Sequence, residues 1–184
     1  MDSDESAVVQ VRLSPFERAH AALVVSWVRD ADELKFVSPE TQPPLTVEKV
    51  MAWGAPAQRQ YVLIAAGETE PLGYAELNDM PNRPQQKWIG HLLLDPARRG
   101  MGLGRACVAT LLAEAFGRLN AEAVVLVVSP SNERAVTCYR SAGMVPLGDE
   151  WKRAPWSTTA HRLLRMGIDR RGYQHTQNNQ SREA

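Results

Sequence analysis

The stretch Leu94-Asp-Pro-Ala-Arg-Arg-Gly-Met-Gly-Leu-Gly-Arg105 decides the expected fold, because it joins a run of leucines to the start of a helical pattern. Apolar residues then recur every three or four positions from Val108 to Leu119, which indicates an amphipathic helix. The continuous apolar run 123–128 that follows is typical of a strand buried on both faces. With 87–94 as the preceding strand, the pattern predicts a strand–helix–strand unit with parallel strands.

The segments on either side of this unit predict further strands and helices. Runs 61–66 and 72–78 flank a turn and predict a β-hairpin. Ser14-Pro15 is predicted to cap and begin a helix that reaches residue 28. The other expected elements are a strand over 8–13, helices over 46–57 and 132–141, loops over 37–45 and 80–84, and a last strand over 157–168. The sequence therefore predicts an α/β fold with a single mixed sheet, antiparallel in its N-terminal part, parallel in its central pair, and flanked by helices.

Length and composition indicate one domain over residues 1–168, followed by a polar, loosely held tail over 169–184. The 21 basic residues balance the 21 acidic ones, so we expect no binding to nucleic acid or to a membrane surface. The acidic start and the lack of a long apolar run predict a cytoplasmic protein. Cys107 and Cys138 lack metal-ligand spacing, so no metal is expected.

Glycines between a strand and a helix suit three kinds of phosphate-binding loop. The P-loop requires Gly-Lys-Ser/Thr, whereas this chain has Gly104-Arg105-Ala106. The dinucleotide fingerprint requires a third glycine, but Arg105 or Cys107 occupies that position, and Glu122 precedes the next strand where the ribose-binding acid should follow it. Both of these alternatives are rejected.

The third kind, Arg-x-x-Gly-x-Gly, is matched by Arg99, Gly102 and Gly104, with Gly100 inside it. Successive N–H groups of such a loop, together with the positive end of the helix that it begins, can bind a pyrophosphate. Basic side chains at 98, 99 and 105 would add charge-assisted hydrogen bonds. A purely structural glycine turn bordered by basic residues is the alternative.

A second motif, Asn132-Glu-Arg-Ala-Val-Thr-Cys-Tyr-Arg-Ser-Ala-Gly-Met144, follows the strand 123–128. Together with the glycine loop, over about residues 87–145, it resembles the GNAT superfamily of N-acetyltransferases. Trp27-Val-Arg-Asp30 and Ile89-Gly-His-Leu-Leu-Leu-Asp-Pro96 more weakly resemble the branch of ribosomal-protein N-terminal and aminoglycoside 6′-acetyltransferases. The resemblance implies a GNAT-like fold and acetyl-CoA as the acyl donor.

The resemblance also implies where the cofactor binds. The main chain of the fourth strand would pair with the pantetheine arm, and the amide of Leu92 would stabilise the oxyanion. The pyrophosphate would lie on the loop amides and on Arg105, while Asn132 would contact the pantetheine, cap its helix, or do both. The implied cofactor-binding residues are Leu92, Leu93, Leu94, Arg98, Arg99, Gly100, Met101, Gly102, Leu103, Gly104, Arg105 and Asn132.

Three residues are catalytic candidates. Tyr139 lies two helical turns after Asn132, on the same face, and a protonated tyrosine there could give its proton to the departing CoA thiolate. A base must deprotonate the attacking ammonium, and either His91 in the fourth strand or Glu76 in its neighbour could serve. Each of the three also has a structural alternative, as a core tyrosine or as hydrogen-bonded strand residues.

The sequence thus predicts an acetyl-CoA-dependent N-acetyltransferase that transfers the acetyl group directly to a primary amine of a small molecule or a peptide. A non-catalytic acyl-CoA-binding sensor or interaction module is the alternative. Carboxylates in the acceptor cleft would indicate a cationic small molecule, and an open groove would indicate a peptide. Trp88 is expected in the core. A homodimer through the last strands is a further possibility, and neither the acceptor nor the acyl length follows from the sequence.

Overall fold

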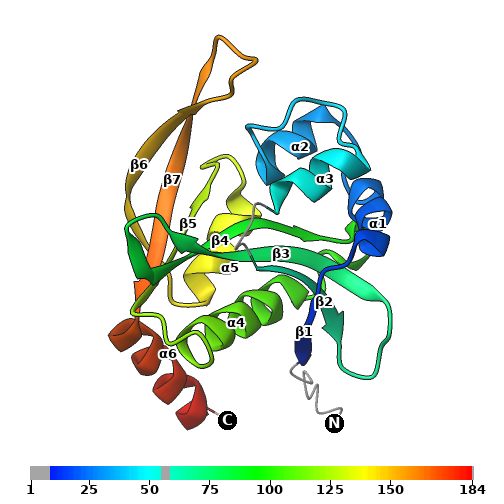
Figure 1. The fold of residues 1–184 in the computed structure, drawn as a ribbon. Helices are drawn as coiled ribbons and strands as arrows, with labels where there is room; N and C mark the ends of the chain where they lie inside the picture. Colours follow the sequence, from blue (N-terminus) through cyan, green and yellow to red (C-terminus); the bar gives the residue numbers. More distant parts are fainter. Residues whose placement is uncertain (1–8, 55–58, 184) are drawn as a thin grey trace.

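The computed structural model describes residues 9–54 and 59–183. Seven strands and six α-helices are described, with two short 3-10 turns (Figure 1). The elements are β1 (Val11–Pro15), η1 (Arg18–His20), α1 (Ala21–Ser26), α2 (Ala31–Val37), α3 (Val47–Trp53), β2 (Gln60–Ala65), β3 (Pro71–Met80), β4 (Arg83–Leu94), η2 (Pro96–Arg98), α4 (Leu103–Phe116), β5 (Ala123–Val128), α5 (Glu133–Ser141), β6 (Val145–Arg153), β7 (Ala160–Asp169) and α6 (Arg170–Glu183).

The strands form one sheet in the order β1-β2-β3-β4-β5-β7-β6. The first four strands are antiparallel, β4 and β5 are parallel, and the last three are antiparallel again. The predicted α/β fold with a parallel central pair is therefore confirmed. In the described part of the chain, the parallel pairing covers only Gln86–Trp88 of β4, so the two strands part after Trp88.

Helices cover both faces of the sheet and bury two separate cores. Figure 1 shows α1, α2 and α3 above the sheet, with α4 and α6 below it. The larger core packs α4 and α5 against the strands through residues such as Leu111, Val124 and Met166. The smaller core packs α1–α3 on the opposite face, around Leu34 and Tyr74. The glycine loop lies between β4 and α4, where the two layers meet.

Two local predictions are wrong, and one helix was not predicted. Ser14 and Pro15 belong to β1, an edge strand that tolerates proline, and the helical turn begins only at Arg18. The helix α2 falls in a stretch for which no element was predicted. The expected loop at 80–84 is a tight turn, with Asn82 at φ 60°, between two longer strands. The predicted end of the second helix lies partly outside the described residues, because 55–58 are not described.

The polar segment 169–184 was predicted to be loosely held, whereas it forms helix α6 over Arg170–Glu183. Tyr173 stacks on Phe116 of α4, with 4.6 Å between ring centroids, and Arg170 donates a 2.6 Å hydrogen bond to the carbonyl of Ala121. An aromatic stack and the hydrogen bonds of Arg170 hold the helix, and the average composition of the segment reveals neither. No helix within the described residues is long and apolar enough to cross a bilayer.

Candidate active site

The glycine loop forms an open turn before α4. Gly100 has φ 81° and Gly102 has φ 75°, in the left-handed region that favours glycine. A Cβ built on either residue would meet no atom within 4 Å, because both face open space. Gly102 is the N-cap of α4, so the first free amides of this 14-residue helix point toward the same space. The loop therefore has the geometry of an anion site.

A cavity of about 1060 Å³ lies in front of this loop, between Leu92–Leu94 of β4 and helices α2 and α5. Beyond Trp88, β4 keeps its pairing with β3 but has no partner on its β5 side in the described register. Main-chain groups along Leu92–Leu94 can therefore pair with an extended ligand as another strand would. The predicted cofactor residues that line this cavity are Leu92, Leu93, Leu94, Arg99, Gly100, Gly102, Gly104, Arg105 and Asn132.

Three predicted cofactor residues do not line the cavity. The guanidinium of Arg98 instead makes two hydrogen bonds, of 2.7 and 2.9 Å, to Glu68 in the turn between β2 and β3. Leu103 is buried in the larger core, and the side chain of Met101 is exposed to solvent. A contact of the Arg98 side chain with the cofactor would therefore compete with its pair to Glu68.

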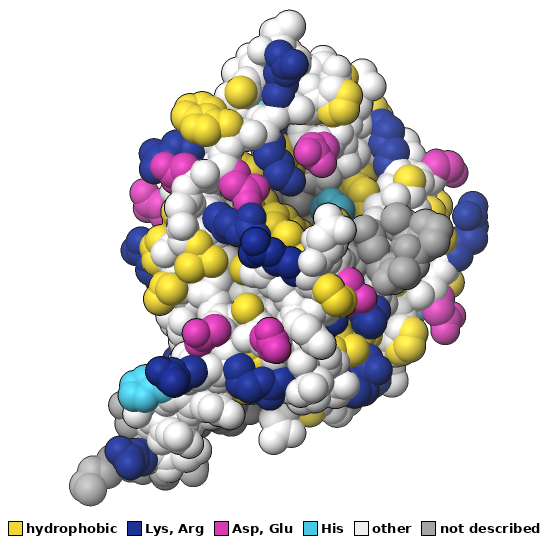
Figure 2. Space-filling model, turned by 60° about the vertical axis from the view of Figure 1, so that its left-hand side comes forward, with side chains coloured by type: hydrophobic (Ala, Val, Ile, Leu, Met, Phe, Trp, Pro, Cys, Tyr) yellow, Lys and Arg dark blue, Asp and Glu magenta, His cyan; other side chains and the backbone are white. Residues whose placement is uncertain are grey.

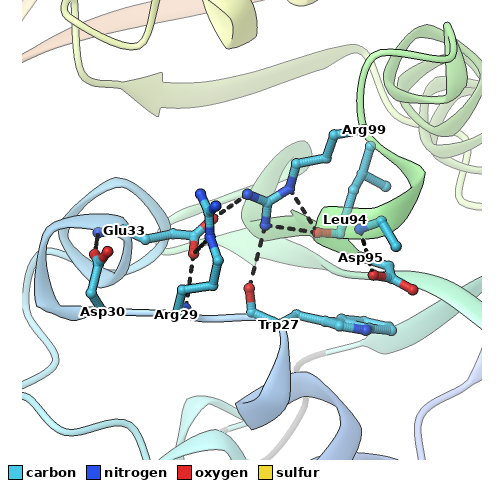
Figure 3. A network of polar contacts seen from close by, with 8 residues as sticks. Trp27, Arg29, Asp30, Glu33, Leu94, Asp95 and Arg99 are labelled. Atoms are coloured by element: carbon cyan, nitrogen blue, oxygen red, sulfur yellow. Dashed lines mark hydrogen bonds and ion pairs between the residues drawn. The ribbon is translucent and has the colours of Figure 1, made fainter.

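Arg99 lines the cavity, but its side chain is already engaged (Figure 3). Its guanidinium donates hydrogen bonds of 2.9 and 3.0 Å to the carbonyl of Leu94 and a 3.4 Å bond to that of Trp27. It also pairs with Glu33 of α2, whose other oxygen accepts from Arg29. Arg99 thus ties the glycine loop to the end of β4 and to α2.

Helix α5 supplies the far wall of the cavity. Asn132 caps the helix by accepting a 3.3 Å hydrogen bond from the amide of Ala135, which confirms the capping role. Tyr139 is mostly buried but lines the cavity, and within the described residues its hydroxyl has no hydrogen-bond partner. Burial, with a contribution from Cys138, raises the pKa of Tyr139 above its ordinary value, so the phenol stays protonated.

Neither cysteine has the character of an acyl-accepting nucleophile. Burial raises the pKa of Cys107 to about 12. Burial also raises the pKa of Cys138, and Arg105 offsets this only in part. Because the thiolate is the reactive form, both cysteines are poor nucleophiles at neutral pH.

A second cavity, of about 460 Å³, adjoins the preceding part of β4, from Trp88 to His91, and has both predicted base candidates in its wall. The ring nitrogen Nδ1 of His91 lies 2.9 Å from Oε1 of Glu76, at ion-pair distance, although its N–H is not aligned for a hydrogen bond. His91 has φ 47°, at the register shift where β3 and β4 change their pairing. Its ring stacks on Trp53, with 4.4 Å between centroids. The bulge and the stacking together aim the imidazole into the cavity.

Glu76 is 1% exposed and fully engaged, whereas the side chain of His91 is 23% exposed. The carboxylate accepts hydrogen bonds from the Tyr74 hydroxyl at 2.7 Å and from the Asn78 amide at 3.0 Å. Burial alone would raise the pKa of Glu76, but its contacts with His91, Tyr74 and Asn78 outweigh burial and hold this pKa below its usual range. Glu76 is therefore a buried anion beside the histidine, and His91 is the member of the pair that is more exposed to the cavity.

Helix α2 separates the two cavities, and Phe36 and Val37 at its end line both of them. Ser38, the next residue, lies 3.1 Å from Nε2 of His91. The sequence reading missed this helix, although Asp30 and Glu33 have the spacing of a helix N-cap and its third residue. In the structure Asp30 accepts a 2.8 Å hydrogen bond from the amide of Glu33. Trp88, expected in the core, is a half-buried wall of the smaller cavity.

This arrangement, a glycine loop before a helix and a split between two parallel strands, agrees with the family comparison. The acetyltransferase (GNAT) family matches residues 24–144, well over half of the chain. The chain belongs to this family. The predicted family is thus confirmed and, at the level of the family, so is the predicted class of acetyl-CoA-dependent N-acetyltransferases.

Two curated relatives match part of this GNAT chain. The N-alpha-acetyltransferase RimI of Mycobacterium tuberculosis is 31% identical over 114 residues, which are 61% of this chain and 67% of that protein. An uncharacterized protein of Mycobacterium leprae is 33% identical over 95 residues, which are 51% of this chain but only 25% of that protein. The chain thus matches only a quarter of the second relative's length.

Solved structures of low identity share the fold. A spermidine N-acetyltransferase from Vibrio cholerae, in complex with CoA and spermine, has a TM-score of 0.74 at 19% identity, covering 90% of this chain and 98% of that one. The aminoglycoside acetyltransferase AAC(6′)-Ib in complex with coenzyme A has a TM-score of 0.73 at 22% identity, covering 91% of this chain and 99% of that one.

Proposed function

We propose that this chain transfers the acetyl group of acetyl-CoA directly to a primary amine. The observation that supports this most strongly is the pair of neighbouring cavities along β4, which share Phe36 and Val37. The larger contains the glycine loop and Tyr139, and the smaller contains His91. Two substrates can therefore occupy neighbouring cavities and meet at the bulge of β4.

The larger cavity suits the donor. The amides of the loop 99–104 and the start of α4 are the proposed pyrophosphate site, with Arg105 as the neighbouring cation. The unpaired side of Leu92–Leu94 is the proposed site of the pantetheine arm. We assign the Leu92 amide to the oxyanion, because it follows the bulge at the point where the cavities approach each other.

For the base we propose His91, with Glu76 as its positioning residue. The ammonium of the acceptor must lose a proton before its nitrogen can attack the thioester carbon, and His91 is the member of the pair that reaches the cavity. Its Nε2 would exchange the contact with Ser38 for the amine or for a bridging water. The Glu76 carboxylate stabilises the resulting imidazolium.

For the acid we propose Tyr139. As the C–S bond breaks, the sulfur takes up a proton. Tyr139 lines the donor cavity, and its hydroxyl has no hydrogen-bond partner among the described residues. The raised pKa keeps that proton in place at neutral pH. Direct transfer also agrees with the protonated state of both cysteines.

Release of CoA thiol from acetyl-CoA in the presence of a panel of amines and peptides tests the proposal. Tyr139→Phe should lower kcat by about 10²- to 10⁴-fold while the Kd for acetyl-CoA is unchanged. Tyr173→Phe is the matched control, because Tyr173 packs on α4 away from both cavities. If the protein binds acetyl-CoA tightly but releases no CoA thiol in the presence of any amine or peptide, the acyl-CoA sensor would be favoured instead.

Two predictions about the wider context stay open, the cytoplasmic location and the homodimer. β6 is an edge strand with exposed Val145, Leu147 and Trp151, which supports the proposal of a second copy at this edge. Sedimentation or light scattering of the protein would test it. A monomer at micromolar concentration would contradict the dimer.

A further inference from the structure

The smaller cavity has four carboxylates in its wall, and three of them are already engaged. Glu76 is 1% exposed and accepts hydrogen bonds from Tyr74 and Asn78. Asp79 accepts from Lys87 at 2.6 Å and from Arg59 at 3.0 Å. Glu150 pairs with Arg165 at 2.5 Å. The second ammonium of a polycationic acceptor would therefore have to compete with cations of the chain itself.

Lys152 of β6 is different, because its ammonium makes no hydrogen bond within the described residues. Its Nζ forms only a long ion pair, of 3.9 Å, with the fourth carboxylate, Glu40, whose side chain is 58% exposed. It lies 5.5 Å from the ring centroid of Trp88, and Arg165 lies over the same ring at 5.9 Å. An ammonium has three donors, so Lys152 keeps its capacity to bind an anion.

The position of Lys152 is fixed by its surroundings. The residue lies on the face of the β6–β7 hairpin that lines the cavity, and its side chain is 32% exposed. The π face of Trp88 attracts the ammonium and holds it at the cavity wall. Figure 2 shows basic and acidic side chains mixed around a hollow that has hydrophobic side chains and a histidine inside it.

The cavity is also bridged on one side. The indole nitrogen of Trp156, in the β6–β7 hairpin loop, donates a 3.2 Å hydrogen bond to the carbonyl of Glu40, in the segment after α2. This contact joins the two sides of the cavity across 116 positions of sequence. A volume of about 460 Å³ with such a bridge suits a small molecule better than an extended peptide.

From this geometry we propose that the acceptor is a small primary amine that also carries an anionic group, a carboxylate or a phosphate. The anionic group binds Lys152 above Trp88, and the amine lies at His91 in the same cavity. This inference rests on the proposed acetyl transfer and specifies the class of its acceptor. Lys152 is then a specificity-determining residue, and the paired carboxylates disfavour polyamines.

Three amines with the same five-carbon chain test the charge of the tail directly: 5-aminopentanoate, pentylamine and 1,5-diaminopentane. We expect kcat/KM for CoA release to fall in that order. In the same assay, 2-aminoethyl phosphate tests a phosphate as the anionic group, and an acidic peptide tests a peptide acceptor. Lys152→Gln should lower kcat/KM for 5-aminopentanoate by about 10- to 100-fold, because one hydrogen bond to a charged group is lost. The kcat/KM for pentylamine should not change. Lys152→Glu should shift the preference toward the diamine.

Arg153→Gln is the matched control, because Arg153 is the next residue of β6, is exposed, and lies on the opposite face of the strand. It should change none of the rates. The inference would be overturned if the wild-type protein preferred the diamine or the peptide, or if Lys152→Gln affected all three amines equally. Neither result would contradict acetyl transfer itself. Absence of CoA release with every amine and peptide would contradict acetyl transfer itself.

Discussion

Replacing Gly102 by alanine tests whether this position requires glycine only for its backbone conformation or also to leave room for a ligand. In the protein alone, the new Cβ meets no atom within 4 Å, so the cost of the substitution is the left-handed φ of 75°. That conformation costs a residue with a Cβ about 1–2 kcal/mol. For a domain of this size we expect a decrease in Tm of roughly 2–8 °C.

Binding of acetyl-CoA should suffer more. The Cβ would project into the space in front of the loop, where the pyrophosphate is proposed to lie, and displace it from at least one amide. A lost hydrogen bond to a charged group is worth about 1.5–3 kcal/mol. This corresponds to a Kd for acetyl-CoA that is about 10- to 100-fold higher, measurable by isothermal titration calorimetry.

Gly67→Ala provides the matched control. Gly67 also has a positive φ, of 80°, and also has open space around its Cβ, but it lies in the turn between β2 and β3. The two variants should lose similar stability, and only Gly102→Ala should lose affinity. Equal affinity of both variants for acetyl-CoA would refute the assignment of this loop to the pyrophosphate.

Three further substitutions test other parts of the structure. The pKa of Glu76 is lowered from its usual 4.5. The charged carboxylate therefore contributes to stability above pH 4.5, and this contribution is lost as the pH falls through the pKa of the folded state. Glu76→Gln should accordingly reduce the dependence of Tm on pH in the acidic range. Glu33→Ala removes the partner of Arg99 on α2, and we expect a higher KM for the amine and a loss of about 1–3 kcal/mol in urea unfolding; an unchanged KM would contradict the coupling of α2 to the site. Tyr173→Ala should cost about 1–3 kcal/mol because it removes the stacking on Phe116, and unchanged stability would show that α6 is not anchored there.

The donor side was largely predictable because its information is local in the sequence. The glycine loop, the start of α4 and the face of α5 that carries Asn132 and Tyr139 are each contiguous segments whose backbone geometry follows from residue type and spacing. The same reasoning did not reveal the partners that the side chains of Arg98 and Arg99 have within the chain. Their partners, Glu68 and Glu33, lie 30 and 66 positions away, and spacing says nothing about them.

The acceptor side was not predictable for the same reason. His91 and Glu76 were separate alternatives in the sequence, and the register shift between β3 and β4 brings them together as one pair. The position of Lys152 over Trp88 depends on β4 and the β6–β7 hairpin reaching the same cavity, which their order along the chain does not reveal.

The sequence by itself therefore determined the fold class, the family and the loop that we assign to the donor, because these depend on short patterns that constrain the backbone directly. Only the tertiary structure decided which side chains face each other across the acceptor cavity and which charges are already neutralised. A charge acts through the groups that surround it in space, and those groups come from β3, β4, the end of α2 and the β6–β7 hairpin.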